Sequence, residues 1–211
     1  MYENVIDPRL EMKRIKSMCT ETELFAYGDK QDNLCYLDFL IETIKRDIKS
    51  GSILNAVFGD GQMPTDAITI PLEYEDEQGN HVRIATGETM SLDFKNAFVL
   101  TDVWSSSRLY NALRDIRKSG FLYDRKDHFA YYYSGLDIFH VRSGNHHAEA
   151  ASYFKVGKME TEVYDVAKLF DHIETDGMDW YNSSSGKKIG TVIDFRVAIL
   201  FELCKMKRTT S

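Results

Sequence analysis

Residues 143–151, with the sequence SGNHHAEAA, combine a glycine turn, two adjacent histidines and the start of a helix. They follow an apolar run over 136–141 and lead into small, helix-forming residues. Glycine adopts backbone angles that other residues avoid, and the first turn of a helix offers N–H groups without intrahelical partners. The segment therefore predicts a strand, a tight turn at Gly144 and Asn145, and a helix whose first turn can hold an anion.

Hydrophobic spacing and turn residues predict the other elements. Helices are predicted over 8–18, 34–48 (ended by Gly51), 109–116 (after serines 105–107 and before Gly120), 146–156, 166–172 and 194–207. Strands are predicted over 67–74, 81–86, 97–101, 129–133, 136–141 and 159–164. The first two strands form a hairpin around residues 77–80, and the glycine-rich segment 59–64 and the polar segment 183–188 are loops. The last helix is expected to bury Val197, Ala198, Leu200, Phe201 and Cys204.

This order of elements predicts an α+β fold, with a mixed sheet flanked by helices. The chain of 211 residues is 43% hydrophobic and 12% aromatic, so it can build a substantial core. We expect an N-terminal helical extension over residues 1–60 and one α+β domain over residues 61–211. A single domain over residues 1–211 is the alternative.

Composition narrows the classes of function. The chain has 26 Lys and Arg against 33 Asp and Glu, a net charge of −7, which argues against binding a long duplex mainly by neutralising its phosphates. Cys19, Cys35 and Cys204 lie far apart without CxxC spacing, which favours a reducing compartment and hence the cytoplasm. No apolar run approaches the length of a membrane span, and the first residues lack the apolar core of a secretory signal.

The two histidines allow two interpretations. Adjacent residues of a helix point about 100° apart, so His146 and His147 serve one small site only if one of them lies in the turn. Either one imidazole packs or caps while the other is solvated, or His146 contacts the ligand.

The segment from Phe98 to Val166 resembles the core of the ParB/sulfiredoxin-like superfamily. Members have a strand with a short loop, a helix followed by glycine, two strands, a Gly-x-His/Arg-Arg turn opening a helix of small residues, then glycine and another strand. The counterparts here are VLTDVWSSSRLYNALRDIRKSGF and HFAYYYSGLDIFHVRSGNHHAEAASYFKVGKMETEVYDV. Gly144, His146 and an alanine at 148 or 150 match the signature.

The resemblance implies that this turn holds the phosphates of ATP or CTP with Mg²⁺, or of a nucleic acid, and in some members supports nuclease or nucleotide-hydrolysing chemistry. The implied binding residues are Arg142, Gly144, Asn145, His146 and His147, and the implied catalytic residues are His146 and His147. The sequence leaves open whether the protein is an enzyme.

The chain departs from the signature at two positions. Residue 147 is His where the signature has Arg, a permanently charged side chain that donates two N–H groups to a phosphate. Residues that could supply the charge are Arg108, Arg114, Arg142, Lys155 and Lys158. Residue 145 is Asn where sulfiredoxins have Cys, so their thiol-repair reaction is not implied.

Three other patterns in the sequence have simpler explanations than a binding site. Asp137, His140, His146, His147 and Glu149 are potential metal ligands, but their spacing matches no established zinc motif and no metal site is predicted. The acidic segment 171–179 lacks EF-hand spacing and is interpreted as a solvated turn rather than a cation site. The aromatic run within 129–133 could stack a base, although alternate residues of a strand face the core.

A second hypothesis is a non-catalytic interaction protein on the same scaffold. An acidic chain can bind a basic protein partner or mimic nucleic acid, as accessory proteins of phages and mobile elements do. The missing arginine favours this hypothesis, whereas the retained Gly-x-His turn favours phosphate binding. The oligomeric state is not predicted.

Overall fold

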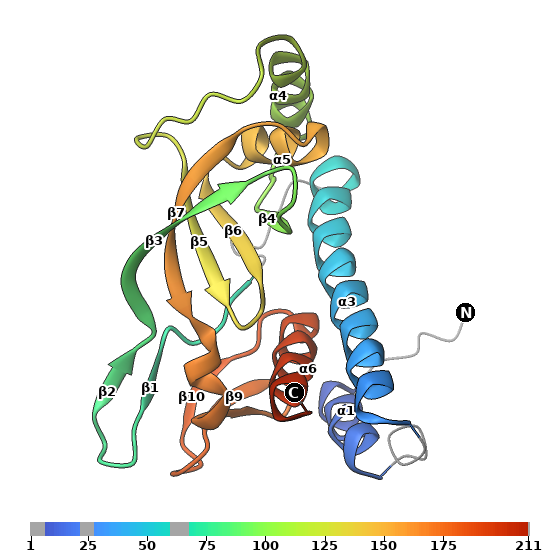
Figure 1. Ribbon diagram of the computed structural model, residues 1–211, viewed down its shortest axis with the longest axis vertical. Coiled ribbons are helices and arrows are strands. Elements are labelled where there is room, and N and C mark those ends of the chain that lie inside the picture. The colour runs from blue at the N-terminus through green and yellow to red at the C-terminus, as the bar shows by residue number, and fades with distance from the viewer. Residues whose placement is uncertain (1–6, 22–27, 60–67, 211) are drawn as a thin grey trace. The chain divides into compact units, whose positions relative to one another are not determined.

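The computed structural model describes residues 7–21, 28–59 and 68–210, and side chains over 7–17, 28–59 and 68–210. The chain divides into two compact units (Figure 1). Unit 1 draws on Met1–Arg46, Thr69–Arg83 and Ala167–Ser211, and unit 2 on Asp47–Ile68 and Ile84–Val166. The predicted loop at 59–64 and the domain boundary at residue 60 lie almost wholly outside the described residues, so both stay predictions.

Unit 1 contains helices and short antiparallel strands. Its elements are α1 (Pro8–Glu21), the first part of α3 (Lys30–Phe58), β1 (Glu73–Glu75), β2 (His81–Arg83), most of the 3-10 helix η1 (Val166–Asp171), β8 (Ile173–Thr175), β9 (Asp179–Asn182), β10 (Lys188–Thr191) and α6 (Phe195–Thr210). Strands β1 and β2 form the predicted hairpin, with shorter strands than expected. The five residues predicted to face the core from α6 are all buried, and Glu202 and Leu203 are buried as well, so the middle of this helix is enclosed on more than one side.

Helix α3 runs beyond its predicted end. Gly51 was expected to stop it, but the helix continues to Phe58, so that prediction is wrong. A glycine costs a helix only about 1 kcal/mol relative to alanine, and contacts beyond it offset this cost. Ser52 Oγ donates to the carbonyl of Thr101 at 3.1 Å, and Ala56 packs in a buried cluster with Val103 and Leu109.

Unit 2 is built on a five-stranded mixed sheet in the order β3-β7-β5-β6-β4 (Figure 1). The strands are β3 (Ala85–Asp93), β4 (Val99–Thr101), β5 (Phe129–Ser134), β6 (Ile138–Ser143) and β7 (Lys158–Asp165), and the helices after β4 and β6 are α4 (Ser106–Ser119) and α5 (Asn145–Phe154). β4 is parallel to β6 and β5 is parallel to β7, while the pairs β5/β6 and β3/β7 are antiparallel. The predicted α+β class with a mixed, helix-flanked sheet is therefore confirmed.

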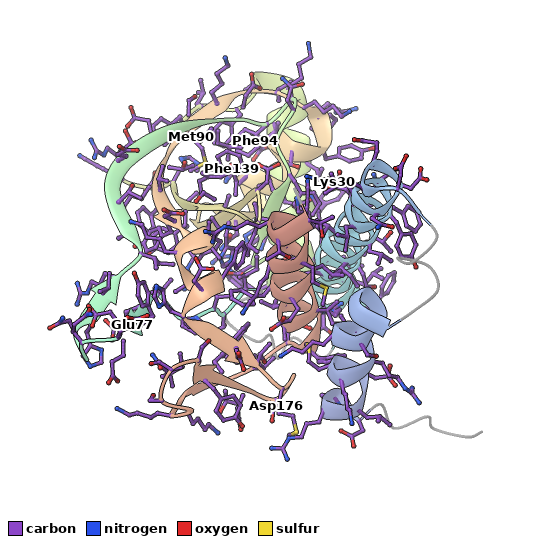
Figure 2. All side chains as sticks on the ribbon, turned by 60° about the horizontal axis from the view of Figure 1, so that its bottom comes forward. Lys30, Glu77, Met90, Phe94, Phe139 and Asp176 are labelled. Carbon is purple, nitrogen blue, oxygen red and sulfur yellow. The ribbon has the colours of Figure 1, made fainter. Side chains whose placement is uncertain are left out.

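The core of unit 2 lies between the sheet and α5. Ala148 and Ala151 of α5 pack in one cluster with strand residues that include Val99, Ala130 and Val141. Phe94 and Phe139, labelled in Figure 2, belong to the same cluster. On its other side α5 meets α4, because Ala150 packs against Ala112 and Ile116. Small residues along α5 thus allow it to pack between the sheet and α4.

The strands that the sequence did not predict lack an alternating apolar pattern or are very short. All residues of β3 from Ala85 to Ser91 are exposed, and only Leu92 is buried, so only its first two residues fell within a predicted strand. Strand β8 lies within the acidic segment that was interpreted as a turn, while β9 and β10 begin at Asp179 and Lys188 and continue through residues for which no strand was predicted. The burial of Ile173, Thr175 and Trp180 shows that this part of the chain contributes to a core.

A buried carboxyl in unit 1 gives a testable pH dependence. Glu202 on α6 is 4% exposed, and Oε1 lies 3.5 Å from Nζ of Lys16, which also donates to the carbonyl of Thr175 at 2.7 Å. Burial raises the pKa of Glu202, although the charges of Lys16 and Lys205 oppose this shift. A carboxyl whose pKa is raised by folding contributes stability below its unfolded-state pKa and loses it as the pH rises through the folded pKa.

We therefore expect the natural chain to lose stability as the pH rises from about 4.5 to neutrality. Glu202→Gln should remove this loss, because the amide does not ionise. Thermal unfolding of both chains across this range should show the variant gaining relative to the natural protein as the pH rises. The exposed residue Glu77 offers a matched control as Glu77→Gln. A variant that instead becomes relatively weaker toward neutral pH would show that the ion pair with Lys16 outweighs burial.

Candidate anion-binding site

The predicted strand, turn and helix around Gly144 are present. β6 ends at Ser143, Gly144 has left-handed backbone angles (φ 78°, ψ 21°), and α5 begins at Asn145. A Cβ at position 144 would overlap Cδ2 of His128 and lie 3.2 Å from the carbonyl oxygen of Asp127. Both the backbone angles and the close packing therefore require glycine at this turn.

The first turn of α5 has open donors. The helical hydrogen bonds begin with the N–H of Ala148, which donates to the carbonyl of Gly144 at 2.9 Å. Within the described part of the chain, no acceptor is found for the N–H groups of Asn145, His146 or His147, and Gly144 provides no side-chain cap. The positive end of the helix dipole adds to these donors, so the turn is suited to an anion.

A cavity of about 500 Å³ lies in front of this turn, and all five predicted binding residues line it. The complete lining is Trp104, Arg108, Asn111, Ala112, Asp115, Arg142, Ser143, Gly144, Asn145, His146 and His147. One wall is thus contiguous in sequence, and the other comes from Trp104 and one face of α4. Trp104, Asn111 and Asp115 were not singled out from the sequence, although the spacing of Asn111 and Asp115 with Arg108 places these three residues on one side of a helix.

The two histidines have different surroundings. The ring of His146 is 8% exposed and lies edge-on to Trp104, with 5.2 Å between the ring centres. Its Nε2 atom is buried and has no hydrogen-bond partner among the described residues. Burial lowers the pKa of His146, the charge of Arg108 lowers it further, and a hydrogen bond to the backbone of Ser105 opposes these effects. His146 is therefore neutral at neutral pH and has one unused ring nitrogen beside the cavity.

His147 is exposed and reaches a second cavity. Its ring centre lies 6.5 Å from that of His128. The second cavity, of about 380 Å³, shares Asp115, Gly144 and His147 with the first and is also lined by Phe121 and Leu122. The adjacent histidines thus diverge, yet both line the first cavity.

Positive charge reaches the cavity through two arginines. Arg108 places its guanidinium carbon 4.4 Å from the centre of the Trp104 ring and forms no ion pair with any described carboxylate. Nη1 of Arg142 lies 3.5 Å from Oδ2 of Asp102. The other candidates for the missing charge, Arg114, Lys155 and Lys158, do not line the cavity. Arg114 pairs with Asp115, Lys158 pairs with Asp93, and Lys155 follows the C-terminal end of α5.

Asn145 and Asp102 fix the position of the turn. The N–H of Asp102, just after β4, donates to Oδ1 of Asn145 at 3.1 Å. The carboxylate of Asp102 lies 3.0 Å from Nε2 of His140, which is fully buried in β6. The side chain of Asn145 thus ties the start of α5 to the end of β4.

The potential metal ligands do not converge. Among the described residues, no group of three His, Cys, Asp or Glu side chains is arranged to hold a metal ion. Glu149 accepts from Thr101 at 2.9 Å and pairs with Lys49 at 3.2 Å, while Asp137 accepts from the hydroxyl of Tyr132 at 3.2 Å. These carboxylates therefore have structural partners in the protein.

The acidic segment and the aromatic run have structural roles. Asp176 lies between β8 and β9, where it accepts the N–H groups of Met178 and Asp179, both at 2.9 Å. In β5, Tyr132 packs against the core cluster and Tyr133 is buried, whereas Phe129 is 36% exposed. None of these residues lines the first cavity.

Fold and cavity together define an α+β protein with a mixed sheet, in which a helix N-terminus, two arginines and a buried neutral histidine line one site. The chain belongs to the DUF6710 family, described as a family of unknown function, whose model matches residues 11–211. No significant match was found among curated proteins or solved structures. No helix in the described ranges is both long enough and apolar enough to cross a bilayer.

Proposed function

We propose that this protein binds the phosphate of a nucleotide, or of a nucleic acid, at the start of α5. The observation that carries the proposal is the set of open N–H groups at residues 145–147 beside a cavity of about 500 Å³. The buried, unpartnered Nε2 of His146 adds independent support, because a buried polar atom ordinarily has a partner. A phosphate oxygen would accept from the N–H groups, and a hydroxyl of the ligand could donate to Nε2 of the neutral His146 ring.

The charges favour modest affinity. A hydrogen bond to a charged group contributes about 1.5–3 kcal/mol net, and the loss of ligand freedom on binding opposes it. Two or three such bonds to main-chain amides, with Arg108 and Arg142 nearby, lead us to expect a Kd between about 1 μM and 1 mM. Arg108 has the larger role because Asp102 already compensates part of the charge of Arg142.

The resemblance to the ParB/sulfiredoxin-like superfamily supports the same site. The corresponding turn in that superfamily holds phosphates of ATP or CTP, and Gly144 and His146 occupy matching positions here. His147 stands in place of the signature arginine, and Arg108 and Arg142 line the cavity where they could supply the missing charge. If the protein hydrolyses its ligand, His147 is the better placed acid or base, because it is exposed at the cavity while His146 is buried.

The test is ligand-dependent stability of the full chain. ATP or CTP, each with and without Mg²⁺, or a short oligonucleotide should raise the melting temperature, since a ligand at about 100 times its Kd stabilises by about 2.7 kcal/mol. Arg108→Ala and His146→Ala should weaken this effect about tenfold in ligand concentration.

The control is Arg117→Ala, because Arg117 lies in the last turn of α4 and does not line the cavity. Unshifted melting with every ligand at millimolar concentration would contradict the proposal and favour the interaction-protein hypothesis. An equal response in the natural chain and in both site variants would place binding elsewhere.

A further inference from the structure

We propose that Trp104 is a stacking platform for a planar ring of the phosphorylated ligand, so that the site selects nucleotides over other phosphates. The inference rests on the proposed phosphate site and adds a residue that determines specificity. Trp104 directly precedes the cap of α4, lines the same cavity and is 47% exposed. A large aromatic side chain exposed in a cavity is typical of a ligand contact.

The indole is held in place before any ligand arrives. The guanidinium carbon of Arg108 lies 4.4 Å from the centre of the Trp104 ring, and the His146 ring lies edge-on to it at an interplanar angle of 79°. These contacts fix the side chain on two sides, so little conformational freedom is lost when a ring stacks on it. The site therefore has the rigid aromatic surface that favours planar groups.

The position of Trp104 relative to the phosphate site matches a ligand with a ring and a phosphate. His146 touches Trp104 and also belongs to the first turn of α5, whose N–H groups are open. One side chain thus separates the two ends of the site, as a sugar separates the base and phosphate of a nucleotide. A cavity of about 500 Å³ exceeds what inorganic phosphate fills and falls within the usual range for small-molecule sites.

The neighbouring cavity provides a poorer surface for a ring. Leu122 is 79% exposed there but has no flat face. The ring of Phe121 is less exposed than that of Trp104, because it packs against two buried clusters of unit 2 and lies edge-on to Phe94 at 4.9 Å and to His128 at 5.0 Å. A base is therefore expected at Trp104 and not at the Phe121 side. The net charge of −7 further favours a free nucleotide over a long nucleic acid strand.

The experiment compares ligands that differ only in the ring. Calorimetric titration of the full chain with ribose 5-phosphate and with adenosine and cytidine monophosphates should show the nucleotides binding about tenfold more tightly. Trp104→Ala should abolish this preference, so that the nucleotides and ribose 5-phosphate bind the variant with about equal affinity. Trp104→Phe should retain part of the preference, and Leu122→Ala should retain all of it.

Fluorescence gives a second measurement that does not depend on a variant. Of the two tryptophans, Trp180 is 1% exposed and belongs to unit 1, so nucleotide-dependent quenching should come from Trp104. Ribose 5-phosphate should cause little quenching. This readout keeps the test decisive if Trp104→Ala does not fold.

The outcomes separate the two proposals. Equal affinity for ribose 5-phosphate and the nucleotides would overturn stacking and leave phosphate binding intact, whereas no binding of any phosphate would overturn both. Loss of the base preference in Leu122→Ala instead of Trp104→Ala would assign the base to the neighbouring cavity and overturn the inference. A short single-stranded oligonucleotide that binds far more tightly than the mononucleotides would overturn the assignment to a free nucleotide.

Discussion

Replacing Lys49 by methionine is expected to lower the free energy of unfolding of unit 2 by about 3 kcal/mol. Nζ of Lys49 lies 3.2 Å from Oε1 of Glu149 and donates to Oγ of Ser152 at 3.0 Å. The side chain of Glu149 is only 9% exposed, and its other partner among the described residues is the hydroxyl of Thr101. Removing the lysine would therefore leave a buried carboxylate without a compensating charge, which costs far more than the loss of a surface ion pair.

The measurement is denaturant unfolding of the full chain, with hydrogen exchange of the α5 amides to assign the effect to unit 2. Lys158→Met is the matched control, because Lys158 is 68% exposed and its partner Asp93 is 36% exposed, and we expect a change of at most about 1 kcal/mol. The double variant Lys49→Met with Glu149→Leu should recover much of the loss, since both charges are then absent. A small effect of Lys49→Met alone would mean that water solvates the Glu149 carboxylate once the lysine is gone.

Gly144→Ala is expected to destabilise unit 2 by about 2–4 kcal/mol and to abolish phosphate binding. At a φ of 78° an L-residue is strained by about 1–2 kcal/mol. The added methyl group would also overlap the ring of His128. That ring is not free to move away, since His128 is 9% exposed and its Nδ1 lies 3.1 Å from the N–H of Asp124.

Gly87→Ala separates the cost of backbone strain from the cost of steric overlap with His128. Gly87 in β3 has a φ of 77°, and a Cβ there would meet nothing within 4 Å. It should therefore show the backbone strain alone, about 1–2 kcal/mol. Thermal unfolding and the nucleotide titration would be run on both variants. If Gly144→Ala were no worse than Gly87→Ala and still bound ligand, the close packing at His128 would have no part in forming the site.

Elements with strong local signals were predictable from the sequence. Ser105 caps α4 by accepting the N–H of Arg108, and Gly120 ends the helix with a left-handed φ, both as the pattern indicates. The turn at Gly144 was also predictable, because glycine follows an apolar strand and precedes small helix formers. Strand β3 could not be predicted in full, since an exposed edge strand needs no alternating apolar residues.

Only one wall of the candidate site could be predicted. Residues 142–147 are contiguous, so a local motif identifies them together. Trp104, Asn111 and Asp115 reach the same cavity because α4 packs against α5, and that packing depends on small residues at distant positions. The ion pair between Lys49 and Glu149 joins α3 to α5 and has no local signature at either residue.

Strand β3 forms one edge of the sheet, since among the described strands it pairs only with β7, and its residues from Ala85 to Ser91 are exposed. An exposed edge strand is a template on which further copies of a chain could polymerise into fibrils. Here the register shifts between Ala85 and Thr89, and the same stretch carries a glycine and the charged Glu88. The irregular pairing and the charge both oppose the addition of a strand from another copy of the chain to β3. This edge of the sheet can therefore stay uncovered in a concentrated solution without seeding aggregation.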